Sequence, residues 1–184
     1  LCIHINSAQE AVQPEGDTNW EGVSSMLKGV AKSVRFPIIV KEVGHGISGT
    51  VARSLKDCKV SAIDISGAGG TSWTKVEKYR TGNNFDVFDE WGIPTAECLS
   101  EVRKEVNLPL IASGGMRNGI EAAKALSMGA NLVGFGLPVL KPATQGFKSI
   151  VDYIENLAKE LRIAMFLVNA RNIEELREVK LKYK

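Results

Sequence analysis

The chain has 184 residues, a formal net charge of +2 and a hydrophobic content of 44%. These values suit one globular domain with a buried core, and the mixing of basic with acidic residues argues against a nucleic-acid partner. No run reaches the roughly 20 apolar residues of a membrane span. Three well-separated cysteines without a C-x-x-C pair argue against a disulfide framework or a zinc site and suit a reducing, cytoplasmic setting.

The first part of the chain predicts a strand, a loop and a helix. Residues 1–6 have the pattern of a short strand, and the chain opens inside it, which indicates that a preceding part of the protein is absent from this chain. Residues 7–17 are polar and are expected to form a loop. Thr18 and Glu21 match a capping box, so a helix is expected to follow as far as about Val34.

The rest of the chain continues this alternation of apolar strand segments and helical segments. Further strands are expected at residues 36–40 and 60–65 and at Leu110 and Leu132. Helices are expected from Ser48 to Asp57, from Pro94 to Val106, over residues 118–128 and in segments through the C-terminus. Residues 66–93, which contain several glycines, are expected to form one long loop.

Alternating strands and helices predict a parallel sheet with right-handed crossovers. Residues 34–39 resemble residues 106–111, two βα units further on, as repeated units would. About five βα units are present, whereas a closed (β/α)₈ barrel needs eight and about 250 residues. The expected fold is therefore α/β, with residues 1–184 forming the last five units of a single TIM-barrel domain. A doubly wound sheet is the alternative, but its first turn would carry G-x-G-x-x-G, which residues 7–12 lack.

Two glycine-containing strand ends predict a phosphate site. Gly114 and Gly115 follow the fourth expected strand, and Gly134 and Phe135 follow the fifth. Backbone N–H groups can approach an anion closely at glycines, and a helix N-terminus adds positive potential. Adjacent strand ends of a TIM barrel hold a phosphate in this way. For either loop alone, an ordinary βα turn that needs glycine is the alternative.

Four polar side chains lie at or just after the end of the first strand, namely His4, Asn6, Gln9 and Glu10. A glutamate beside a phosphate-bearing ligand suits Mg²⁺, which takes one or two carboxylates together with water and phosphate oxygens. A buried, hydrogen-bonded histidine and a solvated loop are the alternatives for these residues.

The second and third strand ends carry further polar groups. Lys41 and Glu42 are neighbours on a strand, so at most one of them faces the barrel axis. An inward lysine requires an anionic partner, either a bound ligand or a nearby carboxylate. The third strand ends in Asp64 and Ser66, and in the glycine-rich turn that follows, Thr71 can hydrogen-bond a flat ligand.

Six longer segments of the chain carry a combined pattern. They are Ile3-His4-Ile5-Asn6-Ser7-Ala8-Gln9-Glu10, Gln13-Pro14-Glu15-Gly16-Asp17, Val40-Lys41-Glu42-Val43-Gly44, Asp64-Ile65-Ser66-Gly67-Ala68-Gly69-Gly70-Thr71-Ser72-Trp73, Trp91-Gly92-Ile93-Pro94-Thr95 and Ala112-Ser113-Gly114-Gly115-Met116-Arg117-Asn118-Gly119. Taken together, these segments resemble the type 2, FMN-dependent isopentenyl-diphosphate delta-isomerase family. The resemblance runs from residue 1 to about residue 176 in family order.

The resemblance implies a TIM barrel that binds FMN and Mg²⁺ and converts isopentenyl diphosphate to dimethylallyl diphosphate, with NADPH as the reductant of the flavin. It implies that Gln9 contacts the substrate, with His4 and Asn6 at the diphosphate end, and that Glu10 holds Mg²⁺. These are the expected catalytic, substrate-binding and metal residues. The expected FMN-binding residues are Lys41, Ser66, Thr71, Gly114, Gly115, Met116, Gly134 and Phe135.

The resemblance also implies a homo-oligomer, a tetramer or an octamer, with a small-molecule diphosphate substrate and neither a nucleic-acid nor a membrane partner. The chain departs from the family in two places: the N-terminal barrel strands are absent, and residues 80–91 are short. Two alternatives stay open, another FMN-dependent barrel enzyme such as a 2-hydroxy-acid oxidase, and a non-catalytic barrel fragment.

Overall fold

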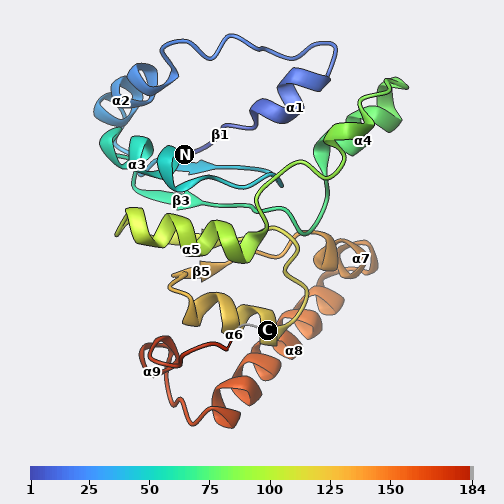
Figure 1. Cartoon of the computed structure of the whole chain (residues 1–184). Coiled ribbons are helices and arrows are strands. Elements are labelled where there is room, and N and C mark those ends of the chain that lie inside the picture. The colour runs from blue at the N-terminus through green and yellow to red at the C-terminus, as the bar shows by residue number, and fades with distance from the viewer. Residues whose placement is uncertain (183–184) are drawn as a thin grey trace.

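The computed structural model describes residues 1–182, and its centre is a five-stranded parallel sheet (Figure 1). The strands are β1 (Cys2–His4), β2 (Ile39–Lys41), β3 (Ala62–Asp64), β4 (Leu110–Ala112) and β5 (Leu132–Val133). Their order in the sheet is their order in the chain, β1-β2-β3-β4-β5. A doubly wound sheet reverses its order at a switch point, so this topology is that of a barrel segment and confirms the predicted α/β barrel fold.

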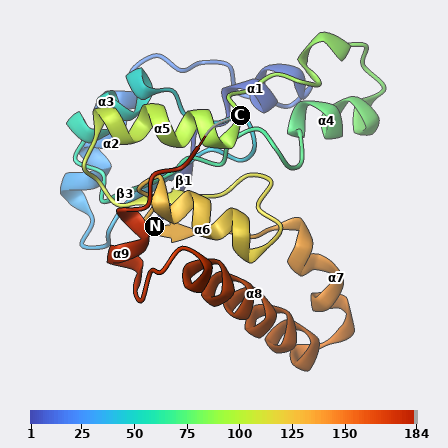
Figure 2. The same ribbon diagram turned by 60° about the horizontal axis from the view of Figure 1, so that its bottom comes forward.

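Helices occupy two different positions around this sheet (Figure 1). The helices α2 (Val23–Ser33), α3 (Gly49–Asp57), α5 (Thr95–Glu105) and α6 (Gly119–Ser127) pack along the strands as crossover helices. Three others, α1 (Ser7–Val12), α4 (Trp73–Thr81) and α7 (Leu137–Gln145), lie beyond the carboxyl ends of the strands, with the short 3₁₀ helix η1 (Asp86–Phe88) after α4. The long helix α8 (Phe147–Leu167) packs beside α6, and α9 (Ile173–Arg177) follows it (Figure 2).

The register of the strands separates a buried face of the sheet from a more open one. Ile3, Val40, Ile63 and Leu110 are aligned across four strands, and the last three of them are fully buried against the crossover helices. Adjacent positions on a strand point to opposite faces. The next row across the sheet therefore faces the other way, where a barrel has its interior; it consists of His4, Lys41, Asp64, Ile111 and Leu132.

Local sequence signals correctly located two helix starts. Ser48 accepts a hydrogen bond from the backbone N–H of Val51 at the start of α3, as its predicted capping role requires. Asn118 does the same for the N–H of Glu121 at the start of α6. These caps lie just after β2 and β4, so they fix where the chain leaves each strand end and enters its helix.

Two segments that were expected to be loops contain helices. Residues 7–17 include α1, which is only six residues long and is capped by Asn6. Residues 66–93 include α4, which begins after Ser72 and ends at Gly82 in the left-handed conformation, and η1. Both helices are short and polar, so their apolar periodicity is weak, and their contact with each other helps to stabilise them.

The prediction that Thr18 and Glu21 form a capping box at the start of a helix was wrong. The helix α2 begins at Val23, after Gly22, which has a φ of 74° and makes no side-chain cap. Near the C-terminus, Asn169 also adopts a left-handed φ, 59°, at the turn after α8. Asparagine tolerates this conformation better than most residues, which explains why it serves where glycine is the usual choice. Within residues 1–182, the long and apolar type of helix needed to cross a membrane is not found.

Candidate functional site

A cavity of about 990 Å³ lies at the carboxyl ends of β3, β4 and β5. The loop after β3, the loop after β4, the loop after β5 and the helix α7 form its walls, and Tyr153 of α8 reaches it from the side. In parallel α/β folds, ligands bind at this end of the strands. A volume in this range suits a ligand of cofactor size.

The loop after β4 crosses the loop after β3 so closely that only glycine fits. A Cβ on Gly114 would lie 2.1 Å from the carbonyl oxygen of Gly67, and one on Gly115 would lie 2.3 Å from that of Gly69. Both residues also have left-handed φ values, 96° and 77°. Within residues 1–182, their own backbone N–H groups donate to no protein acceptor, which leaves them available to an anion.

Side-chain hydrogen bonds join these loops to one another and to neighbouring elements. Thr95 donates a hydrogen bond of 2.7 Å from its hydroxyl to the carbonyl of Gly114, at the start of α5. Ser113 donates one of 2.6 Å from its hydroxyl to Oδ1 of Asp64. Ser66 has a φ of 32°, an uncommon value for a residue with a side chain. Such backbone strain often accompanies functional sites.

The structure brings seven of the eight predicted FMN residues to this one cavity. They are Ser66, Thr71, Gly114, Gly115, Met116, Gly134 and Phe135. The eighth, Lys41, lies on the open face of the sheet in register with Asp64, two strands away from Ile111 on β4. Its ammonium group donates a hydrogen bond of 2.6 Å to the carbonyl of Glu42.

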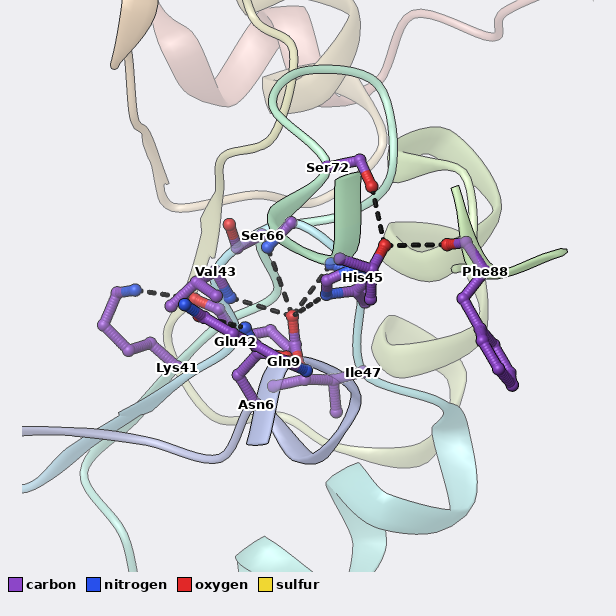
Figure 3. A network of polar contacts seen from close by, with 12 residues as sticks. Asn6, Gln9, Lys41, Glu42, Val43, His45, Ile47, Ser66, Ser72 and Phe88 are labelled. Carbon is purple, nitrogen blue, oxygen red and sulfur yellow. Dashed lines mark hydrogen bonds and ion pairs between the residues drawn. The ribbon is translucent and has the colours of Figure 1, made fainter. Parts of the chain in front are cut away.

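Glu42 points the other way from Lys41 and organises the turn after β2 (Figure 3). Its Oε2 accepts hydrogen bonds from the backbone N–H groups of Val43 at 2.8 Å, Gly44 at 3.2 Å and His45 at 2.8 Å. Three donors compensate the burial of this carboxylate. The expectation that only one of the pair faces the barrel axis is confirmed, and Glu42 fixes the turn that follows Lys41.

The predicted substrate residues Asn6 and Gln9 form a second cluster, on α1. The amide of Asn6 donates to Oε1 of Gln9 at 3.1 Å, and the amide of Gln9 donates to Oε1 of Glu77 on α4 at 2.9 Å. Glu77 is 4% exposed, and its other oxygen accepts from Nε of Arg80 at 2.7 Å. A chain of hydrogen bonds from α4 therefore fixes the rotamer of Gln9.

Glu10, the predicted metal residue, lies on the same helix but engages a different loop. Its Oε2 accepts hydrogen bonds from the side chain of Gln13 and from the backbone N–H of Asp17, both at 2.9 Å. In the described part of the chain, no group of three or more histidine, cysteine or acidic side chains is arranged to hold a metal. A single carboxylate fits Mg²⁺ only if water and phosphate oxygens complete the coordination.

His4 and His45 lie apart from the cavity lining. His4 is exposed on the open face of the sheet, beside Lys41 in register. His45 is buried in the turn after β2, with Nδ1 at 3.7 Å from Oε2 of Glu42. The structure thus places seven of the eight predicted flavin residues together and leaves Lys41, His4, Asn6, Gln9 and Glu10 outside the lining of that cavity.

Sequence reasoning missed four residues that the structure places at or beside these sites. Arg117 lines the cavity and donates to the carbonyls of Gly115 at 3.0 Å and Gly69 at 2.9 Å. Its position next to the paired glycines was a usable signal. Tyr153 of α8 and Glu77 of α4 carried no such signal, because only tertiary contacts bring those helices here. Asp64 was recognised at a strand end but was given no role.

Several curated proteins with similar sequences are named isopentenyl-diphosphate delta-isomerase. The protein of Pyrococcus furiosus is 53% identical over 97% of this chain and 47% of its own length. That of Vibrio campbellii is 48% identical over 98% of this chain and 55% of its own length. The chain spans about half the length of these relatives. These matches confirm the resemblance that the sequence motifs indicated.

Solved structures with a similar fold include a lactate oxidase and a mandelate oxidase. A lactate oxidase from Pediococcus acidilactici superposes with a TM-score of 0.70 at 25% identity, over 92% of this chain and 43% of that chain. A mandelate oxidase solved with benzoyl-formic acid gives a TM-score of 0.67 at 24% identity, over 86% of this chain and 43% of that chain, which shows the fold alone. The family model described as FMN-dependent dehydrogenase matches residues 5–182. The chain therefore belongs to the FMN-dependent dehydrogenase family.

Proposed function

We propose that the complete protein isomerises isopentenyl diphosphate to dimethylallyl diphosphate with FMN and Mg²⁺ bound. The observation that carries this proposal is the convergence of seven predicted FMN residues on one cavity, in a chain whose relatives share the isomerase name. The reaction moves one double bond: a proton is added at the terminal carbon and another is removed from the carbon two bonds before the diphosphate oxygen. No net oxidation takes place.

The residues around the cavity fit FMN in both charge and shape. The unused N–H groups of Gly114 and Gly115 suit the phosphate, and Ser66 and Thr71 supply hydroxyls that can hydrogen-bond polar atoms of the cofactor. The apolar side chains of α7 provide a surface for a flat ligand. When bound and reduced, FMN supplies a proton-exchanging group near N5 of its ring, and NADPH is the proposed reductant.

The chain's own residues bind and orient the substrate in this proposal. Gln9 contacts the substrate from a rotamer fixed by Asn6 and Glu77. Glu10 supplies the carboxylate ligand of an Mg²⁺ ion that neutralises the diphosphate, and His4 lies at the same end. Lys41, on the barrel side of β2, places a positive charge where it favours the anionic form of a reduced flavin.

A 2-hydroxy-acid oxidase is the second candidate, favoured by the likeness to the lactate and mandelate oxidases. Oxidases of that kind require a histidine and an arginine for a carboxylate substrate. Arg117 lines the cavity, but its guanidinium bonds two backbone carbonyls, and neither His4 nor His45 lines that cavity. The isomerase is favoured by Gln9 and Glu10 on α1, because an amide and a carboxylate that can hold Mg²⁺ suit a diphosphate rather than a carboxylate substrate.

Anaerobic incubation of the complete protein with isopentenyl diphosphate, FMN, Mg²⁺ and NADPH tests the proposal. Formation of the dimethylallyl isomer, detected by acid lability or NMR, is the expected result. Oxygen consumption with lactate or mandelate in a parallel aerobic assay, without isomer formation, would establish the oxidase instead. A protein that takes up FMN but performs neither reaction would contradict both.

Glu10→Gln sharpens this test because it removes the charge of the proposed Mg²⁺ ligand and keeps its size. We expect activity at limiting Mg²⁺ to fall by about 100-fold or more while FMN affinity stays within about twofold. Flavin fluorescence measures FMN binding, and a Mg²⁺ titration of the rate measures the metal effect. Glu21→Gln, at an exposed position, is the matched control. Equal loss of FMN in Glu10→Gln would contradict the metal assignment.

A further inference from the structure

Asp64 is the one carboxylate that lines the cavity within the described part of the chain. It is the last residue of β3, in register with Lys41 on β2 and Ile111 on β4, so its side chain lies on the barrel side of the sheet. The remaining lining is mostly glycine, apolar or neutral polar. An acid in such a setting requires a specific donor, because a carboxylate is costly to desolvate without one.

The hydrogen bonds to Asp64 use only one of its two oxygens. Oδ1 accepts from the hydroxyl of Ser113 at 2.6 Å and from the backbone N–H of Ser66 at 3.3 Å. Among residues 1–182, no donor reaches Oδ2. Ser113 and Ser66 thus fix the carboxylate in one orientation, and its Oδ2 is left as an acceptor without a donor from residues 1–182, on a residue that lines the cavity.

The direction of the pKa shift of Asp64 indicates that protein groups compensate the burial of its carboxylate only in part. Burial raises the pKa of Asp64, whereas the hydrogen bond from Ser113 and the nearby charge of Lys41 lower it. The ammonium group of Lys41 donates instead to the carbonyl of Glu42 at 2.6 Å. A ligand that donates a hydrogen bond to Oδ2 would compensate the burial that the protein leaves only partly compensated.

The strand order places Asp64 between the two ends of the proposed flavin site. Gly114, Gly115 and Gly134, proposed for the phosphate, follow β4 and β5, and Lys41, proposed for the ring, is on β2. A ligand that spans these ends crosses β3. In FMN, the segment between phosphate and ring is the ribityl chain, which carries three hydroxyl groups.

We propose that Asp64 accepts a hydrogen bond from a ribityl hydroxyl of FMN through Oδ2, with Ser113 as the positioning residue that orients its carboxylate. This inference rests on the proposed function, because it assumes FMN in the cavity. It adds a specificity element: the protein distinguishes a hydroxylated linker from an aliphatic one, independently of the phosphate loops.

The test measures the affinity of the complete apoprotein for two flavins by fluorescence titration. One is FMN, and the other is its analogue with a phosphopentyl chain that lacks the three hydroxyls. Asp64→Ala is expected to weaken FMN binding by about tenfold to thirtyfold, the usual effect of losing a hydrogen bond to a charged group. The affinity of the analogue is expected to change less than about threefold.

Two further variants keep the test decisive if Asp64→Ala folds poorly. Asp64→Asn retains the size and removes the charge, and it is expected to lose about threefold to tenfold in FMN affinity with the analogue again unaffected. Ser113→Ala is expected to show the same selectivity with a smaller loss, because Asp64 then loses its orientation. Circular dichroism of each apoprotein verifies the fold.

The outcomes separate this inference from the function on which it rests. Equal losses for FMN and the analogue would assign Asp64 a structural role and overturn the inference, while the isomerase proposal would stand. Equal affinity of the unsubstituted protein for both flavins would overturn it as well. Failure of the unsubstituted protein to bind either flavin would overturn both proposals.

Discussion

The two regions at the carboxyl ends of the strands are built in different ways. The cradle formed by Gly114, Gly115 and the loop after β3 is made of backbone, and its shape depends on the absence of side chains. The cluster of Asn6, Gln9 and Glu77 is made of side chains, and the hydrogen bond between Gln9 and Glu77 joins residues 68 positions apart in the sequence.

This difference predicts that the cradle tolerates no added side chain, whereas the cluster on α1 depends on its hydrogen bond to Glu77 of α4. In the cradle, the added atoms of any side chain would occupy space that another backbone already fills. In the cluster, Asn6 is held locally as the cap of α1, whereas Gln9 is held by its hydrogen bond to Glu77 on α4. Substitutions at the two regions should therefore differ in size and in what can rescue them.

The largest effect is expected for Gly114→Ala. Its Cβ would lie 2.1 Å from a backbone oxygen, and its φ of 96° is strained for alanine. We expect the free energy of unfolding to fall by about 2–4 kcal/mol and FMN affinity to fall by at least about 100-fold. Urea denaturation of the apoprotein and flavin titration measure the two quantities.

Gly29→Ala is the matched control for that substitution. Gly29 lies within α2, where an added Cβ meets nothing within 4 Å. Alanine there should stabilise the protein by about 0.5–1 kcal/mol without changing FMN affinity. If Gly114→Ala behaved like this control, the close approach of the two loops would not exist in solution.

An intermediate effect is expected for Glu77→Gln, which tests the side-chain cluster. The substitution removes the negative charge that Arg80 neutralises. Both oxygens of Glu77 accept hydrogen bonds, one from Gln9 and one from Arg80, so the NH₂ group of a glutamine would face one of these donors. We expect a loss of about 1–2 kcal/mol in stability and a larger fractional loss in isomerase activity than in FMN affinity. Urea denaturation measures the stability, a kinetic assay measures the isomerase activity and flavin titration measures the FMN affinity, all on one preparation.

Glu15→Gln separates the role of Glu77 from that of its arginine. Glu15 bonds the same Arg80 but is exposed, so its removal should change stability by at most about 0.5 kcal/mol. Equal effects of the two substitutions would mean that Arg80 alone orders this region and that Glu77 does not position Gln9.

The smallest effect is expected at Cys98, which joins the turn after β2 to α5. Its thiol donates to the carbonyl of Ile47 at 2.9 Å, and burial raises its pKa from 9.0 to about 12. The unfolded chain ionises first as pH rises, so the stability contributed by the neutral thiol is lost above pH 9. By pH 9.5 the loss should be about 0.8 kcal/mol.

Cys98→Ser provides the comparison for this pH dependence, because a serine hydroxyl does not ionise in the range. Denaturation at pH 7 and at pH 9.5 should show the larger decrease in the unsubstituted protein. Parallel decreases in both proteins would mean that the thiol is accessible to solvent in the folded state, contrary to its complete burial.

The sequence by itself determined the alternation of strands with crossover helices and the glycines of the cradle, because these follow from local periodicity and from conformations that only glycine adopts readily. It also indicated the cap at Ser48, which depends on a neighbour three residues away, and the start of a helix near Asn118. Only the tertiary structure decided that residues 7–12 and 73–81 are helical, that Glu77 and Tyr153 reach the sites, and that Asp64 lines the cavity. Those features depend on contacts between segments far apart in the chain, which stabilise short polar helices and fix rotamers that local sequence leaves open.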